Sequence, residues 1–276
     1  MNDLSALITS YYPSLTKSEQ KVASLVLDKP DEAMFHSITE LAEISGVGET
    51  TVIRFCRKVG YHGFQDFKLA LAQDLTFKKL GAVQQEDSED YTRQVFQDAV
   101  SVLQTSINLL DRVALEQAVE LLDGARHIQL FGVGASGITA MDAKNRLLRI
   151  GRRSDAILDS HLQAMMAVTL GEGDVALGFS VSGSTKDTND MLGKAKRAGA
   201  RVIAVTNYAK SPITSLADVV LLTAGKESPL EGGSMTTKMS QLFVVDLLCR
   251  GLALRNAEYA KAMKEKTAQA VSDRIY

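Results

Sequence analysis

The chain has 276 residues, which is enough for two domains, because single hydrophobic cores usually stop growing near this size. Its 45% hydrophobic and 23% charged residues are typical of globular proteins and exclude disorder over the whole length. The 31 lysines and arginines are balanced by 33 aspartates and glutamates, so the formal net charge of −2 excludes a nucleic-acid binder that relies on bulk positive charge.

Short helices are predicted throughout the first 77 residues. Apolar residues three and four positions apart mark a helix at Leu4–Ile8. A second helix is expected to begin near Thr16, with Glu19 as the other half of a capping box, and to end at Pro30. A last helix is expected over residues 65–76.

Residues 37–58 have the pattern of a helix-turn-helix motif. A helix over 38–44 precedes the turn Gly46-Val47-Gly48, and a second helix is expected over 49–59. The apolar positions expected to hold the two helices together are Ile38, Leu41, Ala42, Val47, Val52, Ile53 and Phe55. Because the second helix of such a motif lies in the major groove, double-stranded operator DNA is the predicted partner.

The polar residues of the second helix are predicted to face outward, and those expected to contact DNA are Thr50, Thr51, Arg54, Arg57 and Lys58. The two threonine hydroxyls suit bases or phosphates. The Arg54 guanidinium has the fork that binds guanine or phosphate in a bidentate manner, and Arg57 and Lys58 suit phosphates. The alternative interpretation is a pair of helices with a solvated charged face.

The string VGETTVIRFCRKVGYHGFQDFK, from Val47 to Lys68, resembles the N-terminal domain of the RpiR-type bacterial transcriptional regulators. The resemblance implies a helix-bundle DNA-binding domain over residues 1–77. The chain departs from the family pattern at Gly48-Glu49, where many relatives carry Ser-Gln or Ser-Arg. An acidic residue at the tip of the recognition helix either repels phosphate or accepts a hydrogen bond from a cytosine amino group.

The charge of this proposed DNA-binding domain is concentrated in a few residues. Residues 1–77 hold 7 lysines and arginines against 10 aspartates and glutamates, a net charge of −3, whereas residues 78–276 hold 24 against 23, a net charge of +1. We therefore expect modest non-specific affinity for DNA and reliance on site-specific contacts by a dimer.

A change of composition separates the two halves of the chain. Residues 78–90 read KKLGAVQQEDSED, which is polar and predicts a linker. A single helix is expected to follow over about 91–110, so that residues 78–112 form a linker and connecting helix.

Strand-like runs alternate with helices beyond the linker. The five expected strands are His127–Val133, Ser154–Leu158, Asp174–Phe179, Arg201–Thr206 and Asp218–Thr223. Helices are expected over residues 136–150, 187–198 and 234–253. This alternation predicts a parallel sheet covered on both faces, and therefore an αβα sandwich behind the helical N-terminal bundle. Ligands of such sheets bind at the carboxyl ends of the strands.

Two loops at strand ends suit a phosphate group. The run Gly132–Gly137, GVGASG, fits G-x-G-x-x-G between a strand and a helix, and Asp155 lies at the spacing of a dinucleotide site. The alternative is a tight turn without a ligand. The second loop, Ser180–Thr185, offers four hydroxyls just before another helix N-terminus. The hydroxyls and the helix N-terminus together would hold one phosphate, and a dinucleotide-binding fold does not require this second loop.

The S-x-S-G-x-T string of the second loop resembles the phosphosugar loop of sugar isomerase (SIS) domains, and GVGAS resembles their first loop. The resemblance extends over about residues 120–260. It implies a doubly wound SIS domain over residues 113–265 that binds a phosphorylated sugar as effector. The effector contacts that follow from it are Gly134, Ser136, Ser180, Ser182 and Thr185, with Ser184 added by its position in the loop.

Three further residues are candidates for sugar contacts. His161 follows the second strand and is placed near a sugar hydroxyl, the alternative being a surface or capping histidine. Glu227 and Glu231 follow the fifth strand and suit sugar hydroxyls or, in an isomerase, a catalytic base; the alternative is a solvated loop. The sequence has no metal-binding motif, and no cofactor is expected.

Together these motifs predict a DNA-binding transcriptional regulator of carbohydrate metabolism, with amino sugars among the candidate pathways, and not an enzyme. A homodimer or a dimer of dimers is expected, because paired recognition helices meet two half-sites. The alternative function is a sugar-phosphate isomerase or lyase. Two distant cysteines, no leader and no apolar span of about 20 residues predict a cytoplasmic protein without a membrane partner.

Overall fold

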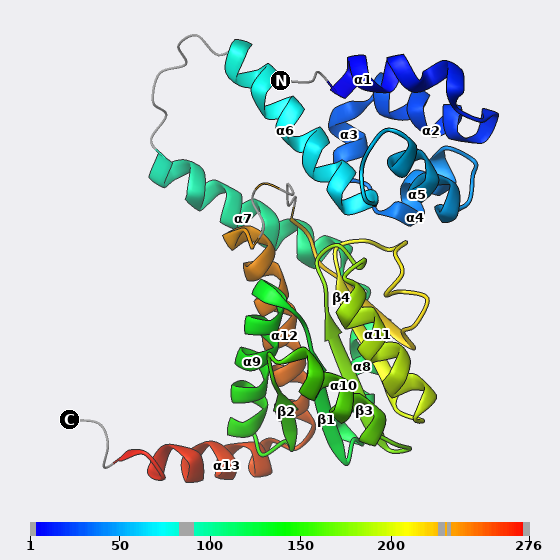
Figure 1. Cartoon of the computed structure of the whole chain (residues 1–276). Helices are drawn as coiled ribbons and strands as arrows, with labels where there is room; N and C mark the ends of the chain where they lie inside the picture. The colour runs from blue at the N-terminus through cyan, green and yellow to red at the C-terminus, as the bar shows by residue number, and fades with distance from the viewer. Residues whose placement is uncertain (1–3, 83–90, 226–229, 231–232, 273–276) are drawn as a thin grey trace. The chain divides into compact units, whose positions relative to one another are not determined.

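In the computed structural model (Figure 1), the described residues are 4–82, 91–225, 230 and 233–272. The chain divides into two compact units. One comprises residues 1–97 with 226–234, and the other comprises residues 98–225 with 235–276. The first is helical in its described part, and the second holds a sheet of five strands.

The helices of the first unit are α1 (Leu4–Tyr11), α2 (Lys17–Asp28), α3 (Pro30–Phe35), α4 (Ile38–Ile44), α5 (Glu49–Lys58) and α6 (Phe64–Ala82), with a 3₁₀ turn at Tyr12–Ser14. The capping box of Thr16 and Glu19 is confirmed, and Ser37 and Glu40 form a second one before α4. Pro30 follows the end of α2 and is also the first residue of α3. Its fixed φ suits the first turn of a helix. The helix α6 runs past residue 77, so residues 78–82 of the predicted linker are helical.

The core of the first unit is built around the recognition helix. Phe55 of α5 is fully buried and meets the Phe67 ring of α6 edge-on, with 5.3 Å between ring centroids. Tyr61 contacts the same Phe67 ring edge-on at 5.5 Å. These aromatic pairs fix α5 against α6, so the outward face of α5 is held by a packed core.

The second unit contains an all-parallel sheet in the order β2-β1-β3-β4-β5. Its strands are β1 (His127–Phe131), β2 (Ser154–Ala156), β3 (Asp174–Phe179), β4 (Arg201–Thr206) and β5 (Val219–Leu222). Five strands were expected, and the bounds of β3 and β4 agree with the prediction. In each of the two, a charged first residue is followed by five buried residues, as expected for strands covered on both faces.

Helices cover both faces of this sheet, which confirms the αβα sandwich. The helices of the unit, beyond its share of α7 (Tyr91–Leu109), are α8 (Arg112–Asp123), α9 (Gly134–Arg149), α10 (Ser160–Thr169), α11 (Lys186–Arg197), α12 (Met235–Arg255) and α13 (Ala257–Gln269). One apolar core joins the sheet to α8, α9 and α12, and another joins it to α10 and α11. Three of these helices, α8, α10 and α13, were not predicted.

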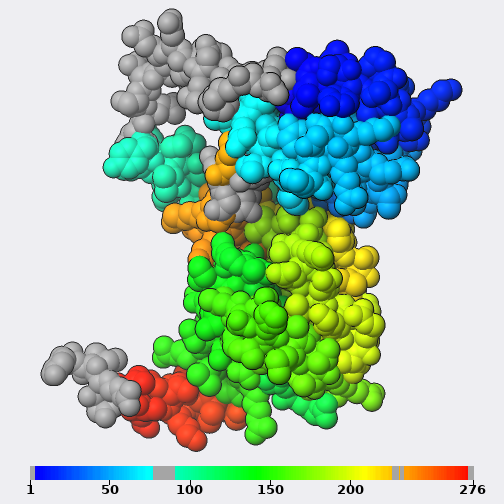
Figure 2. Space-filling view, viewed as in Figure 1, coloured from blue at the N-terminus to red at the C-terminus, as the bar shows by residue number. Residues whose placement is uncertain are grey.

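The C-terminal helix α13 is the least embedded of the set. Figure 2 shows it, in red, at the edge of the second unit with much of its surface exposed. Its end lies at Gln269, beyond the predicted domain end at residue 265. In the described part of the chain, no helix is both long and apolar enough to cross a bilayer.

Candidate functional site

The recognition helix α5 is fixed to α4 by a tight turn. Gly46 adopts φ +63°, which favours glycine, and the Val47 amide donates to the Ala42 carbonyl at 2.9 Å. The Thr39 hydroxyl of α4 donates to the Glu49 carboxylate at 2.5 Å. Glu49, the residue at which the chain departs from the family pattern, is therefore held at the N-terminus of α5.

The structure corrects the predicted outward position of one residue of α5. Thr50, Arg54 and Arg57 are exposed, but Thr51 is only 7% exposed, because it lies on the face of α5 that carries the buried Phe55. Its hydroxyl accepts a hydrogen bond from the Arg54 guanidinium at 3.2 Å. Thr51 can therefore orient Arg54 but does not face outward.

Lys58 has partners inside its own unit. Its ammonium lies 2.8 Å from the Glu19 carboxylate and donates to the Ser14 carbonyl at 3.2 Å. Burial raises the pKa of Glu19, but hydrogen bonds from Lys58 and from Thr16 outweigh it and hold that pKa below the usual value. Lys58 thus fastens α5 to α2, and its contact with DNA stays a prediction, as do those of Thr50, Arg54 and Arg57.

The two loops that resemble phosphosugar loops follow the two strands at the switch point of the sheet. The chain leaves β1 for β2 on one side and then crosses to β3 on the other, so the switch of direction lies between β1 and β3. The loop before α9 follows β1, and the loop before α11 follows β3. In doubly wound sheets such a switch point opens a crevice at the carboxyl ends of the strands, with helix N-termini aimed into it.

The first loop is shaped by glycine and by two buried amides. A Cβ on Gly132 would lie 2.8 Å from the Ser136 carbonyl oxygen, so no larger residue fits there. The Gln163 amide of α10 donates to the carbonyls of Gly132 and Ile157, at 3.1 and 2.8 Å. The Gln241 amide of α12 donates to the Ser136 hydroxyl at 3.1 Å.

Neither glutamine was a predicted site residue. Gln163 and Gln241 reach the first loop from α10 and α12, and no local pattern in the sequence marks such a long-range contact. Both side chains are buried, so their hydrogen bonds are protected from water and fix the loop.

The second loop is held by its own hydroxyls. The Ser180 and Thr185 hydroxyls lie 3.0 Å apart, and the Ser184 amide donates to the Ser182 hydroxyl at 3.2 Å. Gly183 adopts φ +62°, and a Cβ there would lie 2.1 Å from the Ser211 hydroxyl. Ser180 is buried, whereas Ser182, Ser184 and Thr185 are half-exposed at the start of α11. The half-exposed hydroxyls are therefore the ones available to a ligand.

The other sequence candidates are less defined. His161 is exposed in the first turn of α10. Glu227 and Glu231 lie outside the described residues. Asp155, the candidate ribose contact of a dinucleotide site, forms an ion pair with Lys144 at 3.3 Å.

A line of hydrogen bonds leads from the second loop to α7. The Asn207 backbone amide after β4 donates to the Val181 carbonyl at 3.1 Å. The Asn207 side-chain oxygen accepts a short hydrogen bond, of 2.5 Å, from the Thr223 hydroxyl. The next amide, that of Ala224, donates to the buried Ser106 hydroxyl of α7 at 3.1 Å. The carboxyl edge of the sheet is thus bonded to the helix that leads along the chain toward the first unit.

Comparison with known proteins matches each of the two units to a known domain family. The helix-turn-helix domain model of the rpiR family matches residues 2–78, and the SIS domain model matches residues 121–250. An uncharacterised HTH-type transcriptional regulator of Haemophilus influenzae is 40% identical over 96% of this chain and 94% of its own length. The bifunctional protein glk of Burkholderia orbicola is 35% identical over 93% of this chain but only 40% of its own length.

A solved structure extends the likeness to the whole fold. The Vibrio vulnificus NanR protein, complexed with ManNAc-6P, superposes with a TM-score of 0.91 and is 34% identical, with 99% of each chain covered. The SIS domain of an RpiR transcription factor from Sphaerobacter thermophilus superposes with a TM-score of 0.60 at 26% identity, covering 66% of this chain and 99% of that one.

Proposed function

Because the chain belongs to the RpiR family of helix-turn-helix transcription regulators with a SIS domain, we propose that its effector is a phosphorylated amino sugar of the N-acetylmannosamine 6-phosphate type. The observation that carries the proposal is the convergence of the two loops at the switch point between β1 and β3. Likeness to NanR, which is complexed with that sugar phosphate, narrows the class of ligand.

The two loops at the switch point have the chemistry that a phosphate dianion needs. The N-termini of α9 and α11 supply unpaired backbone N–H groups and the positive ends of two helix dipoles. The hydroxyls of Ser182, Ser184 and Thr185 add donors without adding charge. Gly134, which adopts φ +57° at the first turn of α9, lets the backbone approach the ligand closely.

Thermal unfolding of the full chain with different sugar phosphates tests the effector. N-acetylmannosamine 6-phosphate is expected to raise the melting temperature more than glucose 6-phosphate or inorganic phosphate at equal concentration, because a ligand of the native state stabilises it. Equal shifts with all three would show a phosphate site without amino-sugar preference, and no shift with any of them would contradict the proposal.

The crevice is proposed to sense its ligand without converting it. The first relatives that match this chain over nearly their own whole length are transcription regulators, whereas the bifunctional protein glk matches over only 40% of its length. The SIS-fold isomerases among the solved structures, at 17–24% identity, share the fold alone. Isomerisation requires a base near the C1–C2 carbons, and His161 is the candidate within the described residues. Nuclear magnetic resonance of N-acetylmannosamine 6-phosphate incubated with the protein should show no new sugar; formation of an epimer or ketose would establish an enzyme.

The proposed sensor acts on DNA as a homodimer or a dimer of dimers in the cytoplasm, where two recognition helices meet two half-sites about one helical turn apart. Operator binding measured by fluorescence anisotropy, with and without N-acetylmannosamine 6-phosphate, tests this step. The sugar phosphate should change the operator affinity, since an effector acts by binding two states with different affinity. An affinity that does not respond to a bound effector would refute the regulatory role.

A further inference from the structure

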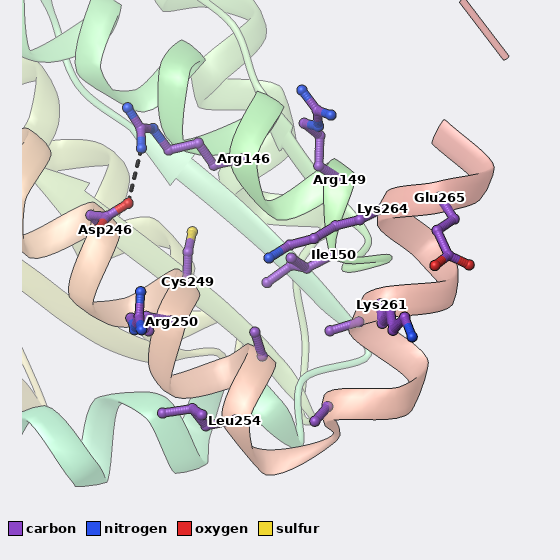
Figure 3. Close-up of a pocket in the computed structure, with 13 residues that line it drawn as sticks. Arg146, Arg149, Ile150, Asp246, Cys249, Arg250, Leu254, Lys261, Lys264 and Glu265 are labelled. Carbon is purple, nitrogen blue, oxygen red and sulfur yellow. Dashed lines mark hydrogen bonds and ion pairs between the residues drawn. The ribbon is translucent and has the colours of Figure 1, made fainter. Parts of the chain in front are cut away.

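A cavity of about 670 Å³ lies between α9, α12 and α13, all helices of the second unit (Figure 3). Its α12 wall runs from Asp246 to Leu254 and its α13 wall from Ala257 to Glu265, at three- and four-residue spacing, so each helix presents one face. The third wall is the last turn of α9, which is the end opposite the first phosphosugar loop. The cavity is therefore distinct from the crevice at the carboxyl edge of the sheet.

The floor of this cavity is apolar. Ile150, Cys249, Ala253, Leu254 and Ala260 contribute hydrocarbon and sulfur surface to it. Burial raises the pKa of the Cys249 thiol to about 12, so the thiol stays protonated and behaves as a small apolar group at neutral pH. The two loops proposed to hold the sugar phosphate, in contrast, offer hydroxyls and backbone amides.

Positive charge surrounds this apolar floor. The cations that line the cavity are Arg146, Arg149, Arg250, Lys261 and Lys264, against the two carboxylates of Asp246 and Glu265. Arg146 is bound to Asp142 at 2.6 Å and to Asp246 at 3.1 Å. Within the described ranges, the other four cations form no ion pair. Figure 3 shows Lys264 extending from α13 over Ile150, while Glu265 points away from them.

We propose that this cavity binds an organic anion, a carboxylate or phosphate carried on an apolar body. The volume is in the range of small-molecule sites, and the combination of an apolar floor with unpaired cations matches the two ends of such a molecule. Stabilisation of a helix C-terminus accounts for Arg146 and Arg149 in the last turn of α9, but not for the cations of α12 and α13.

Calorimetric titration of the full chain with decanoate and, separately, with 1-naphthyl phosphate tests the site. At least one probe is expected to bind with one site per chain, and the two probes distinguish a carboxylate from a phosphate head group. Binding must persist when N-acetylmannosamine 6-phosphate is present in excess, at an ionic strength matched with sodium chloride. Displacement by this sugar phosphate would place the probe at the proposed effector site and overturn the proposal, as would the absence of saturable binding.

Two charge reversals on α13 form a matched pair. Lys264→Glu is expected to weaken probe binding about tenfold or more, because it replaces a cation of the cavity by an anion. Lys266→Glu changes the same charge on an exposed residue of the same helix that does not line the cavity, and should leave the affinity within about twofold. Equal effects of the two variants would show general electrostatic attraction only.

Leu254→Ser tests the apolar end of the ligand. This substitution should weaken the binding of decanoate more than the binding of 1-naphthyl phosphate, because the longer decanoate chain covers more of the apolar floor. Sedimentation of each variant gives its mass in solution. If Lys264→Glu or Leu254→Ser changes the oligomeric state while neither probe binds the wild-type protein, this face is a contact between two copies of the chain and the proposal fails.

Discussion

Arg54 is held toward the outer face of the recognition helix by a partner that is itself buried. The Thr51 hydroxyl accepts from its guanidinium, and Thr51 is anchored on the face of α5 that packs in the core. Such an arrangement restricts the rotamers of a long side chain before DNA is present, so less conformational entropy is lost on binding.

We predict that Arg54→Ala weakens specific operator binding by about 1–3 kcal/mol if the guanidinium contacts a base. Thr51→Val, which keeps the shape and removes the hydroxyl, should weaken it less, because the charge remains and only its orientation is lost. Lys21→Ala removes one exposed cation from the same unit and serves as the control. Fluorescence anisotropy with operator and with scrambled DNA measures all three; an unchanged Arg54→Ala variant would show that this side chain does not recognise the site.

The effector site offers a second test at a single hydroxyl. Ser182 is half-exposed, and its hydroxyl accepts from the Ser184 amide in the second loop. Ser182→Ala should weaken binding of the sugar phosphate about tenfold, the cost of one hydrogen bond to a charged group, while the melting temperature without ligand stays nearly unchanged. Ser215→Ala, at an exposed serine outside both loops, is the matched control. Normal ligand affinity in the Ser182 variant would remove this residue from the site.

Lys68 gives the first unit a stability that depends on pH. The ammonium is buried, donates to the His36 carbonyl at 2.9 Å and lies 5.5 Å from the centre of the Phe64 ring. Burial lowers the pKa of Lys68 to about 8, although Glu40 opposes the shift. The unfolded chain therefore binds more protons than the folded one between pH 8 and the ordinary lysine value of about 10.4, and stability from this group rises with pH in that window.

Replacement by a neutral side chain of similar length isolates this contribution. The free energy of unfolding of the wild-type protein, relative to that of Lys68→Met, should increase by about 1–3 kcal/mol as the pH rises from 8 to 10. Burial raises the pKa of Cys56 to about 12, so this thiol makes the folded protein less stable as the pH rises above 9. Because the wild-type protein and the variant both contain Cys56, this opposite effect cancels in the comparison. Urea unfolding at several pH values measures the contribution of Lys68, and a difference that does not change with pH would contradict the assignment.

At the scale of elements, an ion pair and a helix cap are combined at one carboxylate. Glu19 accepts from the Thr16 amide at 2.8 Å as the cap of α2 and from Lys58 of α5 at 2.8 Å. The Glu19 side chain is nearly buried, so loss of Lys58 would leave a buried negative charge without its ion-pair partner. The recognition helix is thus fixed at its C-terminal end by a residue of another helix.

Lys58→Met is therefore predicted to lower the free energy of unfolding by about 1–3 kcal/mol, and the loss should be smaller in a Glu19→Gln background, where no buried charge remains. Chemical unfolding of the two single variants and the double variant gives the coupling energy. A predominantly DNA-contacting Lys58 would behave differently, since its replacement would weaken operator binding without any coupling to Glu19.

The elements that the sequence predicts best are those with a strong local pattern. The strands β3 and β4 are each five consecutive buried residues after a charged first residue, and the α2 and α4 starts carry complete capping boxes. The helices α10 and α13 begin at single capping residues, Asp159 and Asn256, without a capping box. In addition, α10 has few polar residues to mark an exposed face, and α13 is mostly exposed. In the site, the loops follow from the chain itself, whereas Gln163 and Gln241 depend on tertiary packing and leave no local trace.

At the scale of the whole molecule, the effector edge of the sheet must be connected to the DNA-binding unit. The described hydrogen bonds join the second loop, through Asn207 and Thr223, to Ala224, whose amide is bonded to Ser106 of α7. Because α7 continues along the chain toward the first unit, a change in the second loop that reaches Ser106 also acts on the connection between the units. This route couples the two sites only if the sugar phosphate and the operator DNA each shift the balance between two arrangements of these residues.

We predict that Ser106→Ala reduces the effect of the sugar phosphate on operator affinity. The substitution leaves the buried Ala224 amide without its acceptor, and the loss of that bond loosens the connection between the sheet edge and α7. Ser101→Ala, at an exposed serine of the same helix, is the control. The ratio of operator affinities with and without N-acetylmannosamine 6-phosphate measures the coupling, and calorimetry confirms that the effector still binds. A coupling ratio equal to that of the wild-type protein, at unchanged effector affinity, would show that the signal leaves the sheet by another route.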